Sequence, residues 1–372
     1  MATHPRRMVA LIAGAMVVLA GCSSTASSSP TATTASSGSV APSAEASGPK
    51  IGDVQLPEPE LKNIRLGNSG NPSANVMHII WAECNNLPAK YGLNIDFLQF
   101  DGAGPAAQAL LANQVDVSDN SGGPAIASLA TDSPMVLAYV TRDNLTDNLY
   151  SQPNIKTAED LRGGSIAISS FGSQSHAGAL LSLKVLGLTT DDVTITQVGN
   201  DNARLAALQA GSVSASMNDA TQANDLTGLG LNILVKLADD VKPGQGGNPR
   251  TSLTFLRDFV DKYPNTVLDL VAMYTEANHA WMQDPAKSAQ CLADAADMSL
   301  DDARADIDAV LTEPWTPLDG KCDPGVMDFA KQVLLAANPD LADVNAADAC
   351  TNEFVDKLAD LGFQKQLGIP GY

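Results

Sequence analysis

Short runs of β-branched and other apolar residues alternate with helical patterns along the first two thirds of the chain. This alternation is typical of α/β folds built around largely parallel sheets. A helix is expected over residues 73–90, and from about residue 253 the pattern is helical to the end. Strands are predicted at residues 64–68, 94–100, 115–118, 135–140, 165–168, 193–198, 214–217 and 233–236. The sequence therefore predicts an α/β fold with a helical C-terminal third.

The predicted strands are followed by small, polar, turn-forming residues, at positions 69–73, 101–104, 119–123 and 170–175. Open α/β sheets bind ligands beyond the carboxyl ends of their strands, where helix N-termini offer unpaired N–H groups. Any one of these segments is more simply interpreted as a helix cap or a turn. Their repetition after successive strands favours a ligand cleft.

The N-terminus has the pattern of an export signal. Two arginines precede an apolar run over residues 8–20, which is too short for a membrane-spanning helix of about 20 apolar residues. The run ends in Leu19-Ala20-Gly21-Cys22, which resembles the bacterial lipobox. Residues 1–21 are therefore predicted to be a signal peptide, and the thiol of Cys22 is the predicted lipidation site. This places the protein on the extracytoplasmic face of the cell membrane.

A tether is predicted between the anchor and the folded part. Residues 23–50 consist mostly of Ser, Thr, Ala, Pro and Gly, which bury too little apolar surface to offset the entropy of folding. We expect the flexible linker to occupy residues 22–60. The remaining residues, 61–372, are too many for one minimal core, so they predict two lobes.

The charge and the cysteines restrict the partners. The chain has 42 acidic against 22 basic residues, which argues against binding nucleic acids or anionic lipids, because both require basic patches. Cys84, Cys291, Cys322 and Cys350 make an even number in an oxidising compartment, so one or two disulfides are expected, with the pairing left open. No CxxC pair occurs, and no metal site or cofactor is predicted.

An ordered series of motifs resembles one branch of the bacterial solute-binding proteins. The series contains Tyr91-Gly92-Leu93-Asn94-Ile95, Thr157-Ala158-Glu159-Asp160-Leu161, Ser170-Phe171-Gly172-Ser173-Gln174-Ser175-His176 and Arg204-Leu205-Ala206-Ala207-Leu208. The branch is the SsuA-like, or NMT1-like, group that takes up sulfonates, nitrate and thiamine precursors. The resemblance extends from residue 61 to about residue 285, and beyond that only the helical character matches.

The resemblance implies a type II periplasmic-binding-protein fold, in which two α/β lobes enclose a ligand cleft. Lobe 1 is expected to comprise residues 61–141 and 244–372, and lobe 2 residues 142–243. Carried over by position, the candidate ligand-binding residues are Ser69, Asn71, Gly102, Asn120, Ser121, Phe171, Gly172, Ser173, Gln174, Asn218 and Asp219. His176 fits the motif but is predicted to cap or pack inside its helix.

The ligand itself is left open. The predicted site loops contain no Lys or Arg, which leaves Arg142 and Arg204 as candidate cations. A sulfonate, nitrate or bicarbonate can bind at helix N-termini without a side-chain cation, and a pyrimidine-like ligand also fits the resemblance. Asp119 and Asp219 instead leave room for a neutral or amine-bearing ligand, unless these acids are solvated caps.

The function predicted from these features is that of a monomeric, lipid-anchored binding protein that delivers a small molecule to an ABC permease. A sensory or scaffolding lipoprotein with the same fold would have the same sequence features. An enzyme is the third possibility, since fungal relatives show that the fold can host chemistry. The chain has only four histidines and lacks the hydrolase, zinc-protease and phosphate-loop motifs, so an enzyme is not expected.

Overall fold

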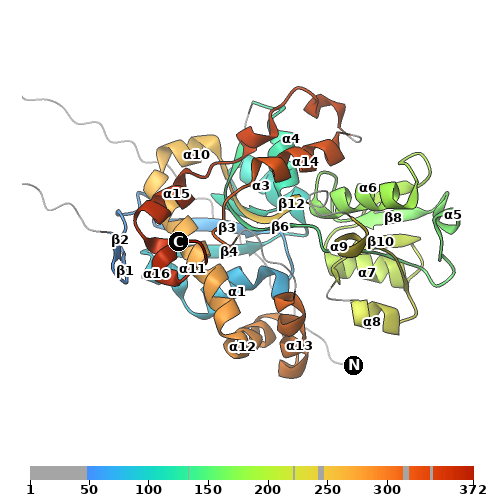
Figure 1. Ribbon diagram of the computed structural model, residues 1–372, viewed down its shortest axis with the longest axis horizontal. Helices are drawn as coiled ribbons and strands as arrows, with labels where there is room; N and C mark the ends of the chain where they lie inside the picture. Colours follow the sequence, from blue (N-terminus) through green and yellow to red (C-terminus); the bar gives the residue numbers. More distant parts are fainter. Residues whose placement is uncertain (1–47, 133, 221–222, 242–246, 313–317, 336–337) are drawn as a thin grey trace, which may run out of the picture. The chain divides into compact units, whose positions relative to one another are not determined.

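The computed structural model describes residues 48–132, 134–220, 223–241, 247–312, 318–335 and 338–372 (Figure 1). The chain divides into two units, residues 1–45 and 46–372, and all described elements belong to the second. The predicted signal peptide, Cys22 and most of the linker therefore lie outside the described residues. None of the described helices is both long and apolar enough to cross a membrane.

Two mixed five-stranded sheets form the centres of two lobes. The first sheet has the order β4-β3-β5-β12-β6, and the second has the order β11-β7-β10-β8-β9. The strands of the first sheet are β3 (Asn63–Asn68), β4 (Asn94–Gln99), β5 (Val117–Asn120), β6 (Met135–Asn144) and β12 (Gly247–Leu256). Those of the second are β7 (Asn148–Ser151), β8 (Ser165–Ile168), β9 (Thr194–Gln197), β10 (Ala215–Asn218) and β11 (Asn232–Lys236).

The pairing of the strands explains how the chain enters and leaves the second sheet. β3 runs parallel to β4 and β5, while β12 is antiparallel to both β5 and β6. β8 runs parallel to β9 and β10, while β7 is antiparallel to β10 and β11. The chain passes from the first sheet to the second between β6 and β7, and β12 brings it back. This agrees with the expected type II arrangement of two lobes joined by two crossovers.

Helices cover both faces of each sheet. The first lobe contains α1 (Met77–Cys84), α2 (Leu87–Lys90), α3 (Ala103–Leu111) and α4 (Gly122–Ser128). The second lobe contains α5 (Ala158–Leu161), α6 (Gln174–Leu186), α7 (Asp201–Gln209), α8 (Ala223–Gly228) and α9 (Leu237–Asp240). The C-terminal third contributes α10 (Arg257–Lys262), α11 (Pro264–Gln283), α12 (Pro285–Ala296), α13 (Leu300–Leu311), α14 (Pro324–Leu334), α15 (Glu353–Asp360) and α16 (Phe363–Leu367).

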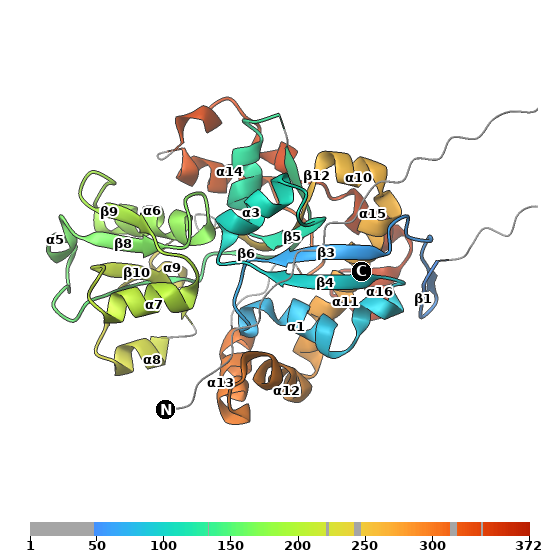
Figure 2. The ribbon, with the colours of Figure 1, turned by 180° about the vertical axis from the view of Figure 1, so that it is seen from behind.

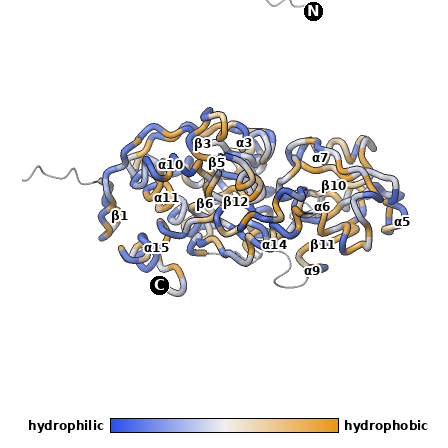
Figure 3. The backbone as a smooth tube through the Cα atoms, turned by 90° about the horizontal axis from the view of Figure 1, so that it is seen from above, coloured by the Kyte–Doolittle hydropathy of each residue, from blue (hydrophilic) through white to orange (hydrophobic). Residues whose placement is uncertain are grey.

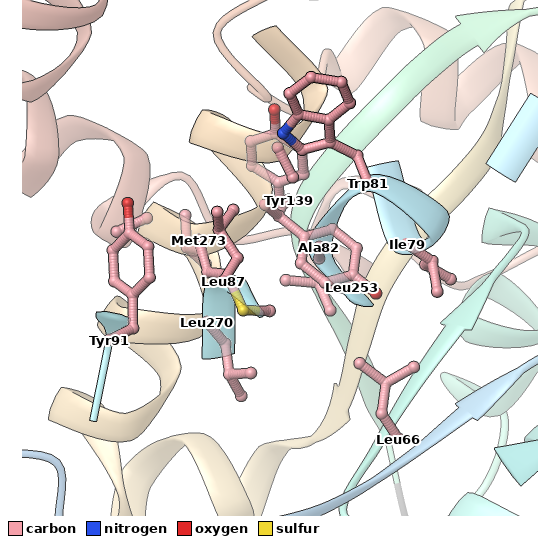
Figure 4. Close-up of a cluster of buried hydrophobic side chains, with 14 of the residues drawn as sticks. Leu66, Ile79, Trp81, Ala82, Leu87, Tyr91, Tyr139, Leu253, Leu270 and Met273 are labelled. Atoms are coloured by element: carbon pink, nitrogen blue, oxygen red, sulfur yellow. The ribbon is translucent and has the colours of Figure 1, made fainter. Parts of the chain in front are cut away.

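The largest core lies between the first sheet and the helices α1 and α11, whereas α3 and α14 lie on the opposite face of that sheet (Figure 2). This cluster includes Leu66 and Leu253 from the sheet, Trp81 from α1, and Leu270 and Met273 from α11 (Figure 4). Apolar segments in the strands and helices alternate with polar connections along the chain (Figure 3). This alternation is the pattern that predicts the fold class.

Residues 48–60 differ from the prediction, which assigned them to the flexible linker. They contain the short strands β1 (Lys50–Ile51) and β2 (Val54–Gln55), which pair as a hairpin. Ile51, Val54 and Leu56 are buried in the largest core. The folded part therefore begins before residue 50. Three apolar residues at the end of the polar tract are enough to dock this segment on the first lobe.

Two strands were not predicted, and one predicted helix is interrupted. Residues 247–256 were not predicted as a strand, but β12 is an inner strand of the first sheet, between β5 and β6. Its polar start and Pro249 hid the strand pattern. β7 was also missed, since its four buried residues give no alternation. The helix expected over residues 73–90 is interrupted at Asn86, which has a left-handed φ of 49°. A further shift places Asp119 and Asn120 inside β5 instead of in the loop after it.

Both possible disulfides are present. Cys84, at the end of α1, is bonded to Cys291 in α12, and Cys322 is bonded to Cys350 across the segment that contains α14. The bond between Cys84 and Cys291 joins positions 207 residues apart, so it removes many conformations from the unfolded chain.

Replacing both Cys84 and Cys291 with Ala is expected to lower the free energy of unfolding by about 2–5 kcal/mol. Guanidinium denaturation under non-reducing conditions measures this difference. The matched control is the Cys322→Ala, Cys350→Ala pair, whose loop of 28 residues predicts a smaller loss. An unchanged midpoint in the first variant would contradict the stabilising role of this bond.

Candidate functional site

A polar cavity of about 120 Å³ lies between the two sheets, at the carboxyl ends of their parallel strands. The segments that follow β3, β4 and β5 line it from the first lobe, and those that follow β8, β9 and β10 line it from the second. Seven of the predicted ligand residues line this cavity, namely Ser69, Asn71, Gly102, Ser121, Ser173, Gln174 and Asp219.

Helix N-termini from both lobes point to this cavity. Gly102 precedes α3 with a φ of 109°, a conformation that favours glycine and leaves the start of the helix without a side-chain cap. Ser173 caps α6 by accepting a hydrogen bond from the His176 N–H at 3.3 Å. Asn200 caps α7 in the same way, accepting from the Ala203 N–H at 3.0 Å. The cavity wall thus carries several partly positive helix ends and hydroxyl or amide groups.

A buried ion-pair group closes one side of the cavity. Arg250, from β12, forms ion pairs with the carboxylates of Asp219 and Asp147, the second at 3.5 Å between the charged atoms. The three side chains are buried, with 6–8% of each residue exposed. The side-chain amide of Asn75 donates to Asp219 at 2.7 Å. The amide of Gln174 donates to Asp147 at 2.6 Å. The group draws residues from both lobes.

Asp147 retains its proton more strongly than an ordinary aspartate. Burial raises its pKa to about 6, with further increases from the charges of Asp219 and Asp201, although Arg250 acts in the opposite direction. The neighbouring groups therefore offset only part of the free-energy cost of burying the ionised carboxylate of Asp147.

The second guanidinium at the cavity, Arg204 of α7, is also engaged. It pairs with Asp201 and donates to the backbone carbonyl oxygens of Met217 at 2.8 Å and Gly199 at 2.7 Å. Among the described lining residues, three aspartates thus face two arginines. The other candidate cation, Arg142, does not line the cavity, but is buried and donates to the Asn75 side chain.

Two buried polar atoms at the cavity have no hydrogen-bond partner among the described residues. They are Oγ of Ser121 and Nδ2 of Asn71. Ser121 is 4% exposed and lines the cavity. Because buried polar groups are normally paired, both atoms are available to a bound molecule.

The remaining four predicted ligand residues do not line the cavity. Asn120 lies within β5, and its amide donates to the carbonyl oxygen of Ala103 at 2.8 Å. Asn218 ends β10 and accepts from the Ser216 hydroxyl at 2.6 Å. Phe171 is 59% exposed, with its ring edge-on to His176. Gly172 has a φ of 80°, and its N–H donates to Nδ1 of His176 at 3.0 Å. The last two residues form a turn beside the cavity.

Burial determines the roles of His176 and His78. His176 accepts the Gly172 N–H and is buried, which lowers its pKa to about 4, so it is a neutral packing residue. His78 in α1 pairs with Asp119 at 2.8 Å, and both are buried. Asp119 is therefore neither a solvated cap nor a lining residue of the cavity. No group of three or more His, Cys, Asp or Glu in the described ranges is placed to hold a metal ion.

Sequence reasoning missed four important lining residues, Arg250, Thr251, Asp147 and Asn75. Arg250 and Thr251 belong to the strand that was not predicted. Asp147 lies in the crossover from β6 to β7, and Asn75 lies in the 3-10 turn before α1. A polar residue such as Asp147 in a crossover gives no local signal, because its role depends on an arginine more than 100 positions away.

The rims of the lobes meet through two hydrogen bonds and a close approach of two glycines. The Gly104 N–H donates to the Ser170 hydroxyl at 2.9 Å, and the Asn200 amide donates to the Asp101 carboxylate at 3.0 Å. Gly123 in the first turn of α4 lies so close to Gly172 that a Cβ atom there would be 1.7 Å from its carbonyl oxygen. The contact at Gly123 leaves no space for a side chain at this position.

The model of the NMT1-like family matches residues 58–296, which is more than half of the chain. Comparison with curated proteins finds no match. Among solved structures, a protein from Bordetella bronchiseptica RB50 has 23% identity and a TM-score of 0.72, over 83% of this chain and 99% of its own. The alkanesulfonate-binding protein SsuA from Xanthomonas axonopodis pv. citri, bound to MOPS, has 20% identity and a TM-score of 0.63, over 78% and 99%. The periplasmic nitrate-binding protein NrtA from Synechocystis PCC 6803 has 13% identity and a TM-score of 0.63, over 84% and 90%. These likenesses show the periplasmic-binding-protein fold.

Proposed function

The chain belongs to the NMT1-like family, and we propose that it is a lipid-anchored, extracytoplasmic solute-binding protein of an ABC importer. The observation that carries this proposal is the polar cavity between two lobes, with buried hydroxyl and amide atoms that lack protein partners among the described residues. A small organic molecule or an oxyanion bound there satisfies these atoms. The names of two structural neighbours, an alkanesulfonate-binding and a nitrate-binding protein, support a solute as the ligand.

The proposed mechanism is closure of the lobes on the ligand, with the crossover between β6 and β7 acting as one hinge. Most of the second crossover, between α9 and β12, lies outside the described residues. The ligand contributes contacts with both lobes, which stabilise the closed form relative to the open one. The closed form then docks on the membrane permease. The ion pairs of Arg250 with Asp147 and Asp219 lie beside the β6–β7 crossover and connect the two lobes.

Membrane attachment is tested by metabolic labelling with a palmitate analogue. The wild type is expected to take up the label and to sediment with membranes, whereas Cys22→Ala is expected to lose both properties. Ser23→Ala is the matched control and should behave as the wild type. Labelling of Cys22→Ala would contradict lipid attachment at this position.

Transport is tested by comparing solute uptake in cells that contain or lack the protein. Loss of high-affinity uptake together with reversible binding in vitro supports import. Reversible binding without any effect on uptake favours a sensory or scaffolding lipoprotein. Conversion of a bound compound into a product would instead make the protein an enzyme.

A further inference from the structure

We propose that the ligand carries a protonated amine and that Asp147 is the carboxylate that binds it. This inference rests on the proposed solute-binding function, because it names the ligand class of the same cavity. It differs from the sulfonate and nitrate ligands named for the structural neighbours, so the two can be separated by experiment.

The first argument is the balance of charge. The described residues that line the cavity include Asp147, Asp201 and Asp219 against Arg204 and Arg250. Arg204 forms an ion pair with Asp201, and the guanidinium of Arg250 lies closer to Asp219 than to Asp147. Asp147 is thus left with a 3.5 Å ion pair and one amide donor from Gln174. A buried carboxylate needs a close cation, and a ligand ammonium provides one.

The second argument comes from the adjoining space. A second cavity of about 640 Å³ shares Asn75, Asp201 and Asp219 with the first and adds Asp302 and Asp306 of α13. Its described lining residues include no lysine or arginine. The approach to the ligand site is therefore acidic, which attracts a cation and repels an oxyanion.

The third argument is independent of the acids. Ser121 is nearly fully buried, lines the cavity, and its hydroxyl oxygen has no partner among the described residues. The side-chain amide nitrogen of Asn71 is likewise buried without a hydrogen-bond partner among the described residues, and it can only donate. These atoms require a ligand with a hydrogen-bonding group, at least one of whose atoms accepts. A small amine with a hydroxyl or carbonyl group meets both demands.

The elevated pKa of Asp147 agrees with this assignment. The charged and polar groups that act on it are Arg250 of β12, Asp219 after β10, Asp201 of α7 and Gln174 of α6, and burial outweighs the cation among them. A bound ammonium stabilises the ionised form, so the amine and a proton on Asp147 compete. Amine binding is therefore expected to weaken as the pH falls below about 6.

The test is a titration of the purified protein with ethanolamine, its uncharged analogue ethylene glycol, and the anions methanesulfonate and nitrate, followed by thermal shift and calorimetry. Ethanolamine is expected to bind at least tenfold more tightly than ethylene glycol, and the anions are expected to bind more weakly than either. Asp147→Asn should weaken ethanolamine binding by about a hundredfold and remove its dependence on pH near 6.

Asp328→Asn, an exposed position on α14 that does not line the cavity, makes the same change of charge and should leave binding unaltered. Tight binding of methanesulfonate or nitrate, unaffected by Asp147→Asn, would overturn the assignment while leaving a solute-binding protein. Failure of every compound to bind would count against both the amine and the solute-binding function. Circular dichroism confirms that Asp147→Asn is folded before its affinity is interpreted.

Discussion

Gly123→Val is expected to weaken ligand binding at least a hundredfold without unfolding either lobe. The Cβ atom of the valine would lie 1.7 Å from the carbonyl oxygen of Gly172, which is much shorter than real Cβ contacts. Gly172 belongs to the second lobe and Gly123 to the first, so the clash exists only when the rims touch. The open form has no such conflict, and a ligand that requires contacts with both lobes loses most of its affinity.

The measurement is calorimetric titration of wild type and variant with the same compound, together with thermal denaturation. Gly228→Val at the end of α8 is the matched control, because a Cβ atom added at this position would have no heavy atom within 4 Å. The control should bind as the wild type does. Wild-type affinity in Gly123→Val would mean that the lobes need not approach each other at this point.

Asp269→Asn is expected to stabilise the protein by several kcal/mol at pH 8. Asp269 is fully buried in α11, and neither of its carboxylate oxygens has a hydrogen-bond partner among the described residues. Burial raises its pKa to about 8, with smaller increases from Glu60 and Glu58. The native state therefore holds a proton that the unfolded chain releases above pH 4, and the unfolding free energy falls as the pH rises from about 4 to 8.

The total loss by pH 8 is on the order of 5 kcal/mol for this one group. The range from pH 6.5 to 8 separates the contribution of Asp269 from those of Asp147 and His176, because the pKa shifts of these two residues affect stability below pH 6.5. Urea denaturation at these two pH values should show a fall of about 2 kcal/mol in the wild type, which Asp269→Asn removes. Exposed Asp261→Asn should leave the fall in place. An equal pH dependence in wild type and Asp269→Asn would contradict the buried titration.

Local sequence patterns were sufficient for the elements whose residues alternate or cluster by type. The bounds of β8 were predicted to the residue, and β3 and β11 to within one residue, since each is a short β-branched or apolar run between turn residues. The loops after these strands were likewise recognisable. Seven of the residues expected to bind ligand line the cavity, because segments at the carboxyl ends of parallel strands converge in any fold of this kind.

The parts that escaped prediction depend on contacts between distant residues. β12 is an inner strand because β5 and β6 flank it, and its own polar sequence does not reveal this environment. Arg250 was therefore not predicted at the site, and neither were its ion pairs with Asp147 and Asp219. In the opposite direction, Phe171 and Asn120 have the residue types of ligand contacts, but one faces solvent and the other supports the start of α3.

The central claim is that a small molecule binds between the lobes and draws them together. Small-angle scattering of the purified protein with and without saturating ethanolamine tests it directly, with Gly123→Val measured alongside. A smaller radius of gyration in the wild type on addition of the ligand, and no change in Gly123→Val, is the predicted result. A bound ligand that leaves the radius of gyration of the wild type unchanged would contradict capture by lobe closure.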